Sequence, residues 1–259
     1  MSVLKIIDLA SHLDDYLHVQ SIPDYAPALN GLQLTHEGPV RRIAAAVDVS
    51  MRAIDGAIAE SANVLLVHHG MFWAGLERIS GPYYERVRKL VAGDIAVYAV
   101  HLPLDVHDVH GNSRLLATEL GLNPSAGFAL HAGVHCGVSG ECDFDTMTLR
   151  DQFRAFSRKH GGDVHTTHFD PGRRTRRWAI CSGSGANLET LREAAAIGVD
   201  TLLVGEGAHW TAVDAPERGL VIMYGGHYAT ETLGVCSLAA YVEGQFGVPW
   251  TFIPAPTGL

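Results

Sequence analysis

Six short apolar runs, separated by segments of helical periodicity, set the strongest limit on how this 259-residue chain can fold. Each run is about as long as a buried strand and is rich in Val, Ile, Leu or Ala. The runs are 43–47, 64–67, 95–100, 178–181, 201–204 and 220–224. Strand, helix and strand in repetition predict an α/β fold with mostly parallel sheets flanked by helices.

Residues that favour helix ends support this order of elements. Ser50 and Asn187 are suited to cap helices at their amino ends, and Gly121 and Gly198 are suited to end them. The expected helices cover 51–62, 113–120, 148–160 and 188–197. The alternation of apolar runs and helical segments changes near Pro124, so we expect a second α/β unit over 127–225.

The composition of the chain excludes some classes of function. The chain has 19 Lys and Arg against 28 Asp and Glu, a net charge of −9, which argues against general nucleic-acid binding. The first ten residues do not resemble a signal peptide, and no apolar run has the length of a membrane span. Four cysteines without a CxxC pair fit a reducing compartment, so we expect a cytoplasmic protein.

Histidines and carboxylates follow three of the apolar runs directly. The chain holds 15 His, and six candidate metal ligands lie at these ends: His68, His69, His101, Asp105, His227 and Glu231. In open α/β sheets, ligands bind beyond the carboxyl ends of the strands, so these side chains are expected near one another. Any one of these histidines alone is more often a structural residue. Three groups together favour a metal site at the strand ends, between the two domains.

The spacing of these residues favours two metal ions. His227 and Glu231 are four residues apart, so in a helix both face one side. His68 and His69 are adjacent, and in an extended strand they would point in opposite directions, which fits two metals better than one. Nitrogen and oxygen ligands for two ions leave open positions for water, as in catalytic sites. Zn, Mn, Fe, Co and Ni all fit such ligands, and the pattern does not distinguish them.

Two further features are candidates for substrate contacts. The turn Ser182, Gly183, Ser184 and Gly185 follows one strand and precedes a helix, so its backbone N–H groups are candidates for anion binding. A tight strand–helix turn explains the same residues without a ligand. His101 and Glu206 are candidate proton-transfer groups.

Two weaker patterns have ordinary explanations. His131, His135, Cys136 and Cys142 lack a standard zinc spacing, and strand periodicity accounts for them. Residues 150–177 hold eight Lys and Arg against three Asp. They form either a solvated face or a rim that attracts anionic substrates.

Four ordered motifs give the chain a family resemblance. They are Asn30-Gly31-Leu32-Gln33, Leu66 to Trp73 (LVHHGMFW), His101 to Asp105 (HLPLD) with Gly111-Asn112, and Gly226 to Glu231 (GHYATE). Together they resemble the Nif-three-like dinuclear metal proteins, also labelled GTP cyclohydrolase type 2-like. The interval between Asp105 and His227 has no room for the inserted domain of longer members, so the chain resembles the short form.

The resemblance implies a fold and a site. It implies that the first domain is discontinuous, 1–126 together with 226–259, and that 127–225 is inserted. It implies two divalent ions per chain, held by His68, His69, Asp105, His227 and Glu231, with Glu231 bridging both. It also implies a homohexamer. His101 matches a histidine near the site whose ligation is less certain.

These observations lead to one expected function and one alternative. We expect a metal-dependent hydrolase that acts on a small anionic metabolite, phosphate-bearing or nucleotide-like. The alternative is a non-catalytic metal-binding or regulatory assembly protein. Turnover by the metal-loaded protein distinguishes the two.

Overall fold

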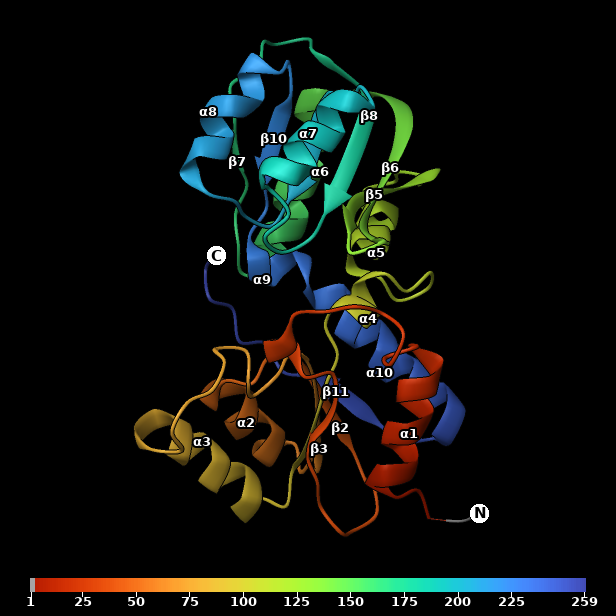
Figure 1. The fold of residues 1–259 in the computed structure, drawn as a ribbon, viewed down its shortest axis with the longest axis vertical. Helices are drawn as coiled ribbons and strands as arrows, with labels where there is room; N and C mark the ends of the chain where they lie inside the picture. The colour runs from red at the N-terminus through yellow and green to blue at the C-terminus, as the bar shows by residue number, and fades with distance from the viewer. Residues whose placement is uncertain (1–2) are drawn as a thin grey trace. The chain divides into compact units, whose positions relative to one another are not determined.

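The computed structural model describes residues 3–259 and divides into two compact α/β units (Figure 1). Unit 1 runs to His107 and resumes over Gly234–Ala255. Unit 2 comprises Asp108–Leu233 and Pro256–Leu259. Each unit has its own sheet with helices on both faces, so the predicted α/β class with sheets flanked by helices is confirmed.

The sheet of unit 1 is largely parallel. Its strand order is β1-β4-β3-β2-β11. The strands are β1 (Gly31–Leu34), β4 (Ala96–Ala99), β3 (Val64–His69), β2 (Ile43–Asp48) and β11 (Trp250–Phe252). The pairs among β4, β3, β2 and β11 are parallel, and only β1 runs antiparallel to its neighbour. The apolar runs at 43–47, 64–67 and 95–100 therefore form its buried centre, as expected for parallel strands.

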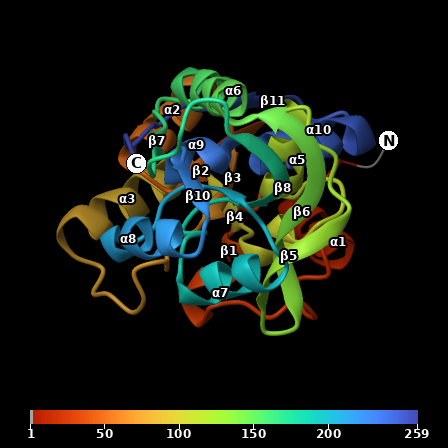
Figure 2. The ribbon, with the colours of Figure 1, turned by 90° about the horizontal axis from the view of Figure 1, so that it is seen from above.

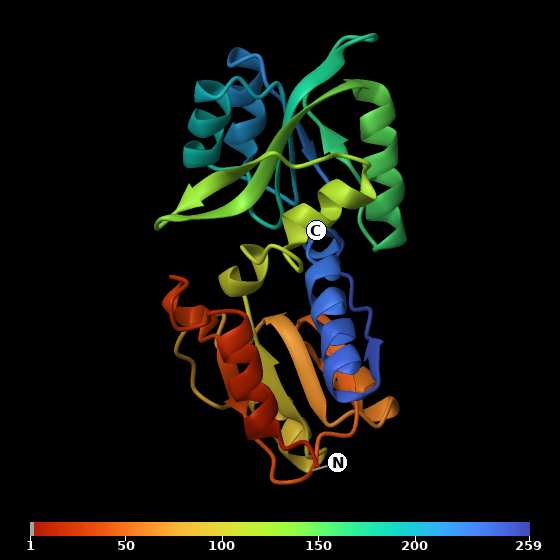
Figure 3. The ribbon, with the colours of Figure 1, turned by 90° about the vertical axis from the view of Figure 1, so that its right-hand side faces the viewer.

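Helices cover both faces of this sheet because alternate strand residues point to opposite sides. On one face Ile43 and Ala45 pack with α1 (Ile6–Tyr16) and α10 (Thr232–Phe246), which lie side by side in Figure 3. On the other face Ala44 and Ala46 pack with α2 and α3. These helices span Met51–Ala59 and Gly81–Ala92. Unit 1 also holds a short 3-10 turn, η1 (Ala26–Ala28), and a one-turn helix, α4 (Leu102–Asp105).

The sheet of unit 2 is mixed rather than mostly parallel. Its order is β5-β6-β8-β9-β10-β7. The strands are β5 (Ala126–His131), β6 (Val134–Asp145), β8 (Arg174–Cys181), β9 (Thr201–Val204), β10 (Val221–Tyr224) and β7 (His165–Thr166). Only β8, β9 and β10 pair in parallel. β5 and β6 form an antiparallel hairpin, as strands joined by a short turn do, and the pairs β6–β8 and β10–β7 are also antiparallel.

Helices again lie on both faces of the sheet of unit 2. α5 (Asn112–Glu119) and α6 (Thr146–Lys159) pack on the face that carries Trp178. α7 (Leu188–Ala196) and α8 (His209–Glu217) pack on the face that carries Leu202. Figures 2 and 3 show α6 across the sheet from α7 and α8. The short helix α9 (His227–Thr230) follows β10.

The division into units lies at different residues from the predicted domain boundaries at 126/127 and 225/226. α5 packs Leu116 and Ala117 against Val138 and Trp178, so 108–125 joins unit 2. The backbone N–H of Tyr228 donates to the Leu259 carbonyl, and both residues belong to unit 2. As a result, His227 and Glu231 lie in unit 2. Within residues 3–259, no helix has the length and hydrophobicity needed to cross a membrane.

Candidate metal centre

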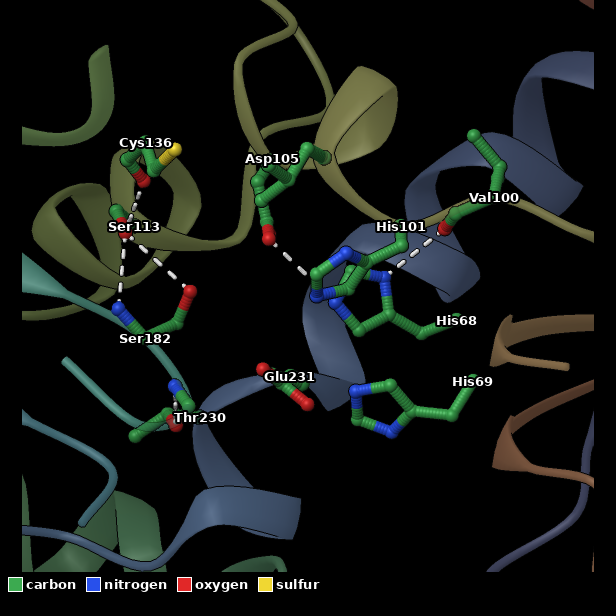
Figure 4. A network of polar contacts seen from close by, with 12 residues as sticks. His68, His69, Val100, His101, Asp105, Ser113, Cys136, Ser182, Thr230 and Glu231 are labelled. Carbon is green, nitrogen blue, oxygen red and sulfur yellow. Dashed lines mark hydrogen bonds and ion pairs between the residues drawn. The ribbon is translucent and has the colours of Figure 1, made fainter. Parts of the chain in front are cut away.

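The first group of candidate ligands lies at the carboxyl end of β3 in unit 1. β3 extends to His69, so both histidines belong to the strand itself and both are buried. Nδ1 of His68 lies 3.0 Å from the carbonyl oxygen of Val100, which follows the neighbouring strand β4 (Figure 4). Nδ1 of His69 lies 2.9 Å from Oδ1 of Asp48, at the end of β2 on the other side. The two rings are thus held from opposite neighbouring strands.

These contacts correct one expectation from the sequence. Adjacent residues in a strand were expected to point in opposite directions, yet the ring centroids of His68 and His69 lie only 4.8 Å apart. Both residues lie at the end of β3, and the contacts of Nδ1 with Val100 and with Asp48 hold the two rings in this arrangement. Two adjacent imidazoles can therefore face the same space.

The anchoring contacts fix the tautomers of both rings. A carbonyl oxygen and a carboxylate oxygen accept hydrogen bonds, so we assign the ring proton to Nδ1 in His68 and in His69. Nε2 then carries the lone pair. A metal-binding histidine usually donates its other ring N–H to a carbonyl or carboxylate, and both residues show that pattern.

His101 and Asp105 complete the group in unit 1. The ligand nitrogens of His68, His69 and His101 all lie within 4.8 Å of one another. Oδ2 of Asp105 lies 3.5 Å from Nε2 of His68. Pro103 is in the first turn of α4, a position that a helix tolerates, and this single turn carries Asp105 back toward His68. Three imidazoles and a carboxylate form a donor set suited to a borderline divalent ion.

Asp24 and Asn30 hold His101 in place. Nδ1 of His101 lies 2.8 Å from Oδ1 of Asp24, and the backbone N–H of His101 donates to Oδ1 of Asn30 over 2.7 Å. Burial opposes ionisation of Asp24, but hydrogen bonds from His101, Asn30 and the Leu102 N–H outweigh it and lower the pKa of Asp24. Asp24 is therefore an ionised acceptor in the fold.

Trp73 and Gln33 belong to the surroundings of this group. The Trp73 ring packs on His69 and His101, with centroids 4.6 and 4.5 Å away, while 38% of the residue is exposed. Oε1 of Gln33 accepts from the backbone N–H of Met71 over 2.7 Å. A Cβ at Gly70 would overlap the Gln33 side chain, so the glycine permits this close approach.

The second group of candidate ligands lies in unit 2. His227 begins α9 and Glu231 follows its end, and Nε2 of His227 lies 3.1 Å from Oε2 of Glu231. The expected placement of these two residues on one side of a helical turn is therefore present. Nδ1 of His227 lies 2.8 Å from Oε1 of Glu206, which also accepts from the Ser184 hydroxyl over 3.0 Å. Burial alone would lower the pKa of His227, but Glu231 and Glu206 outweigh it and raise this pKa to about 9.

Gly183 lets the chain approach Glu231 closely. Its φ is +61°, and a Cβ there would overlap Oε1 of Glu231. The Gly183 N–H donates to the Thr230 hydroxyl over 3.1 Å, and the Ser182 N–H donates to the Ser113 hydroxyl over 3.0 Å (Figure 4). These two backbone donors of the turn are used inside unit 2. They therefore give no support to the anion-binding role predicted for residues 182–185.

The two weaker sequence patterns have structural explanations. The groups of three or more potential ligands found in residues 3–259 include none of His131, His135, Cys136 and Cys142, which lie on the β5–β6 hairpin or its long second strand. The arginines of 150–177 pair largely with acidic side chains: Arg150 with Asp151, Arg154 and Arg158 with Asp163, Arg174 and Arg176 with Asp143, and Arg177 with Glu141. This local pairing offsets much of the positive charge of the segment.

The sequence predicted these candidate histidines, but not the residues that contact them. Asp48 directly follows the run 43–47, so the strand-end argument could have found it. Asp24 lies outside regular structure, in a segment with no periodic pattern. Its pairing with His101, 77 positions away in the chain, has no signal in a single sequence.

The fold and these ligand groups define a class: two-unit α/β proteins with histidine and carboxylate groups suited to metal binding. The chain belongs to the family Duf34/NIF3 (NGG1p interacting factor 3), whose model matches residues 4–257. It is 41% identical over 252 residues to the GTP cyclohydrolase 1 type 2 homolog of Deinococcus radiodurans, covering 97% of this chain and 94% of that protein. The predicted family resemblance is therefore confirmed.

Two solved structures show the same fold. Protein ybgI, described as a protein of unknown function, is 30% identical, with a TM-score of 0.88 over 99% of this chain and 100% of that one. TTHA1606 from Thermus thermophilus is 35% identical, with a TM-score of 0.82 over 99% of this chain and 100% of that one.

Proposed function

We propose that the protein binds two divalent metal ions and uses them to hydrolyse a small anionic metabolite. The observation that carries the proposal is the shared arrangement of its candidate histidines. In His68, His69, His101 and His227, Nδ1 contacts an oxygen acceptor, an arrangement that orients the opposite ring nitrogen, Nε2, for metal binding. Both the family and the ligand chemistry favour this assignment.

Ligand number supports two ions rather than one. His68, His69 and Asp105 in unit 1 and His227 and Glu231 in unit 2 supply more donor atoms than one tetrahedral ion needs. We propose that these five residues hold both ions and that Glu231, with two carboxylate oxygens, bridges them. Zn, Mn, Fe, Co and Ni all suit this set of nitrogen and oxygen ligands.

When bound, a pair of divalent ions supplies Lewis acidity and an activated nucleophile for hydrolysis. The residues of the chain would then orient the ligands and exclude water from the buried imidazoles. Glu206 holds His227 through Nδ1, and Ser184 donates to the same carboxylate, so both fix the direction of Nε2. In this proposal Glu206 positions a ligand, and its predicted proton-transfer role stays a second assignment.

Hydrolysis is tested on the metal-loaded protein with a panel of phosphoesters, nucleotides and cyclic amides. We expect turnover of at least one class, and loss of that turnover in Glu231→Gln. Turnover by no metal form would favour the alternative of a non-catalytic metal-binding or regulatory protein. The name of the relative from Deinococcus radiodurans makes GTP a required member of the panel.

Substrate charge is tested separately with inorganic phosphate. Two divalent ions held by these five ligands keep open coordination positions, which an anionic ligand such as phosphate can fill. Calorimetry should detect phosphate binding to the two-metal form and none to the metal-free protein. Equal phosphate binding to the two forms would contradict the proposed anion site at the metal ions, because phosphate would then bind to other groups of the protein.

A further inference from the structure

The carboxylate of Asp24 accepts four N–H groups. Oδ1 accepts from His101 Nδ1 and from the Tyr25 backbone over 2.8 and 2.7 Å. Oδ2 accepts from the Asn30 side chain and from the Leu102 backbone, each over 2.8 Å. Only an ionised carboxylate, with two acceptor oxygens and no proton, satisfies four donors at once.

This arrangement leaves His101 with one tautomer. Three of the four donors, two backbone N–H groups and an amide NH2, cannot become acceptors. The Asn30 amide cannot rotate either, because its Oδ1 accepts from the His101 backbone N–H. Nδ1 of His101 therefore carries the ring proton and donates a hydrogen bond to Asp24, and the lone pair lies on Nε2.

The ring of His101 is also fixed in orientation. It packs 4.8 Å from the His68 ring and 5.6 Å from the His69 ring, with Trp73 at 4.5 Å. Its ligand nitrogen belongs to the same group as those of His68 and His69. Thus the third imidazole is held in the same way as the other two: Nδ1 is bound to an acceptor of the protein.

We propose that Asp24 is a positioning residue of the metal centre, which fixes His101 so that the Nε2 lone pair faces the ions bound near His68 and His69. The inference rests on the proposed metal centre but not on hydrolysis. It gives a role to the segment before β1, where Asn30 of the first sequence motif completes the support of His101. Loss of the carboxylate would then act on metal binding without removing any ligand.

Asp24→Asn tests this tautomer directly. The new NH2 group meets donors whichever way the amide turns. Each oxygen position faces two donors, but one of the two at Oδ1 is His101, which can adapt by accepting at Nδ1 and placing its proton on Nε2. That proton would point at the metal group. We expect the variant to show His101 protonated at Nε2 and to bind Zn²⁺ about 10–100-fold more weakly.

The readout is a two-bond ¹H–¹⁵N correlation spectrum of the metal-free protein labelled at histidine, recorded well above the ordinary histidine pKa. The signal of His101 is assigned by its absence in His101→Gln. Calorimetry with Zn²⁺ gives the affinity of each variant. Both measurements are independent of turnover, so failure of the hydrolase proposal leaves them interpretable.

Two variants serve as matched controls. Asn30→Ala removes the acceptor of the His101 N–H but leaves the Asp24 carboxylate, so it should keep the proton of His101 on Nδ1. Asp14→Asn changes another carboxylate of unit 1, which accepts from the Tyr98 hydroxyl over 2.8 Å, and it should keep the wild-type spectrum. Thermal unfolding confirms that each variant is folded.

Three results would overturn the proposal. They are a wild-type His101 protonated at Nε2, an Asp24→Asn variant that keeps the proton on Nδ1, and a changed tautomer without weaker Zn²⁺ binding. An Asn30→Ala variant with as much His101 protonated at Nε2 as in Asp24→Asn would also contradict it. A general loosening of the structure around His101 would then explain the effect.

Discussion

The fluorescence of Trp73 can report on metal binding by the histidines of unit 1. Its ring touches His69 and His101 and is partly exposed, whereas Trp178 is fully buried in the core of unit 2. A paramagnetic ion held by these histidines quenches a neighbouring indole far more than distant ones. We predict that Co²⁺ or Ni²⁺ quenches the protein fluorescence and that Trp73→Phe removes most of the metal-dependent change.

The control for this prediction is Trp210→Phe, which removes a tryptophan that lies in α8 of unit 2. It should lower the total fluorescence and keep the size of the metal-dependent change. Equal quenching in wild type and Trp73→Phe would show that the ion binds away from His69 and His101.

At the scale of single residues, the sequence pointed to the histidines that lie together but not to the residues that hold them. His68, His69 and His101 follow apolar runs, and their ring nitrogens lie close to one another. Asp24 contacts His101 from a segment 77 positions away in the chain, which no local pattern encodes. Trp73 contacts the same ring from the turn that follows β3. The turn 182–185 shows the opposite case: its small residues look open to an anion, but Ser113 and Thr230 already accept from two of its N–H groups.

Among the elements, α7 has the best-defined start. The side chain of Asn187 accepts from the Thr190 N–H, and the Thr190 hydroxyl accepts from the Asn187 N–H, each over 3.0 Å. The Thr190 hydroxyl also donates to the Gly185 carbonyl over 2.7 Å, which ties the helix to the turn before it. We predict that Asn187→Ala lowers the free energy of unfolding by about 1 kcal/mol.

Urea unfolding followed by circular dichroism measures this change. Asn187→Asp, which keeps a capping oxygen, should recover most of the loss. A loss of stability in Asn187→Asp equal to that in Asn187→Ala would contradict the capping role.

The predicted elements agree with the structure where burial is continuous or a cap is present. β9 (Thr201–Val204) and the capped starts of α2 and α7 match the prediction to the residue. The sequence did not reveal that the second sheet is mixed, because β5 and β6 alternate loosely and are partly exposed. It also did not reveal that α5 joins unit 2, since the packing partner of an amphipathic helix is set by tertiary contacts.

At the scale of the whole molecule, the oligomeric state is tested by measuring the mass of the protein in solution. The resemblance of the motifs leads us to propose a homohexamer with closed symmetry, the usual form of soluble assemblies. Light scattering coupled to size exclusion should give about six times the chain mass of 27.8 kDa. A mass equal to that of one chain at micromolar concentration would contradict the proposal.

Binding of a pair of metal ions by histidines and carboxylates of both units is the central proposal. The most direct test is elemental analysis of protein purified without chelator and reloaded with one divalent metal, compared with Glu231→Gln. We predict about two ions per wild-type chain and weaker binding of both ions in the variant, because Glu231 is assigned to both. No bound metal in the wild type, or two ions bound at wild-type affinity in Glu231→Gln, would contradict it.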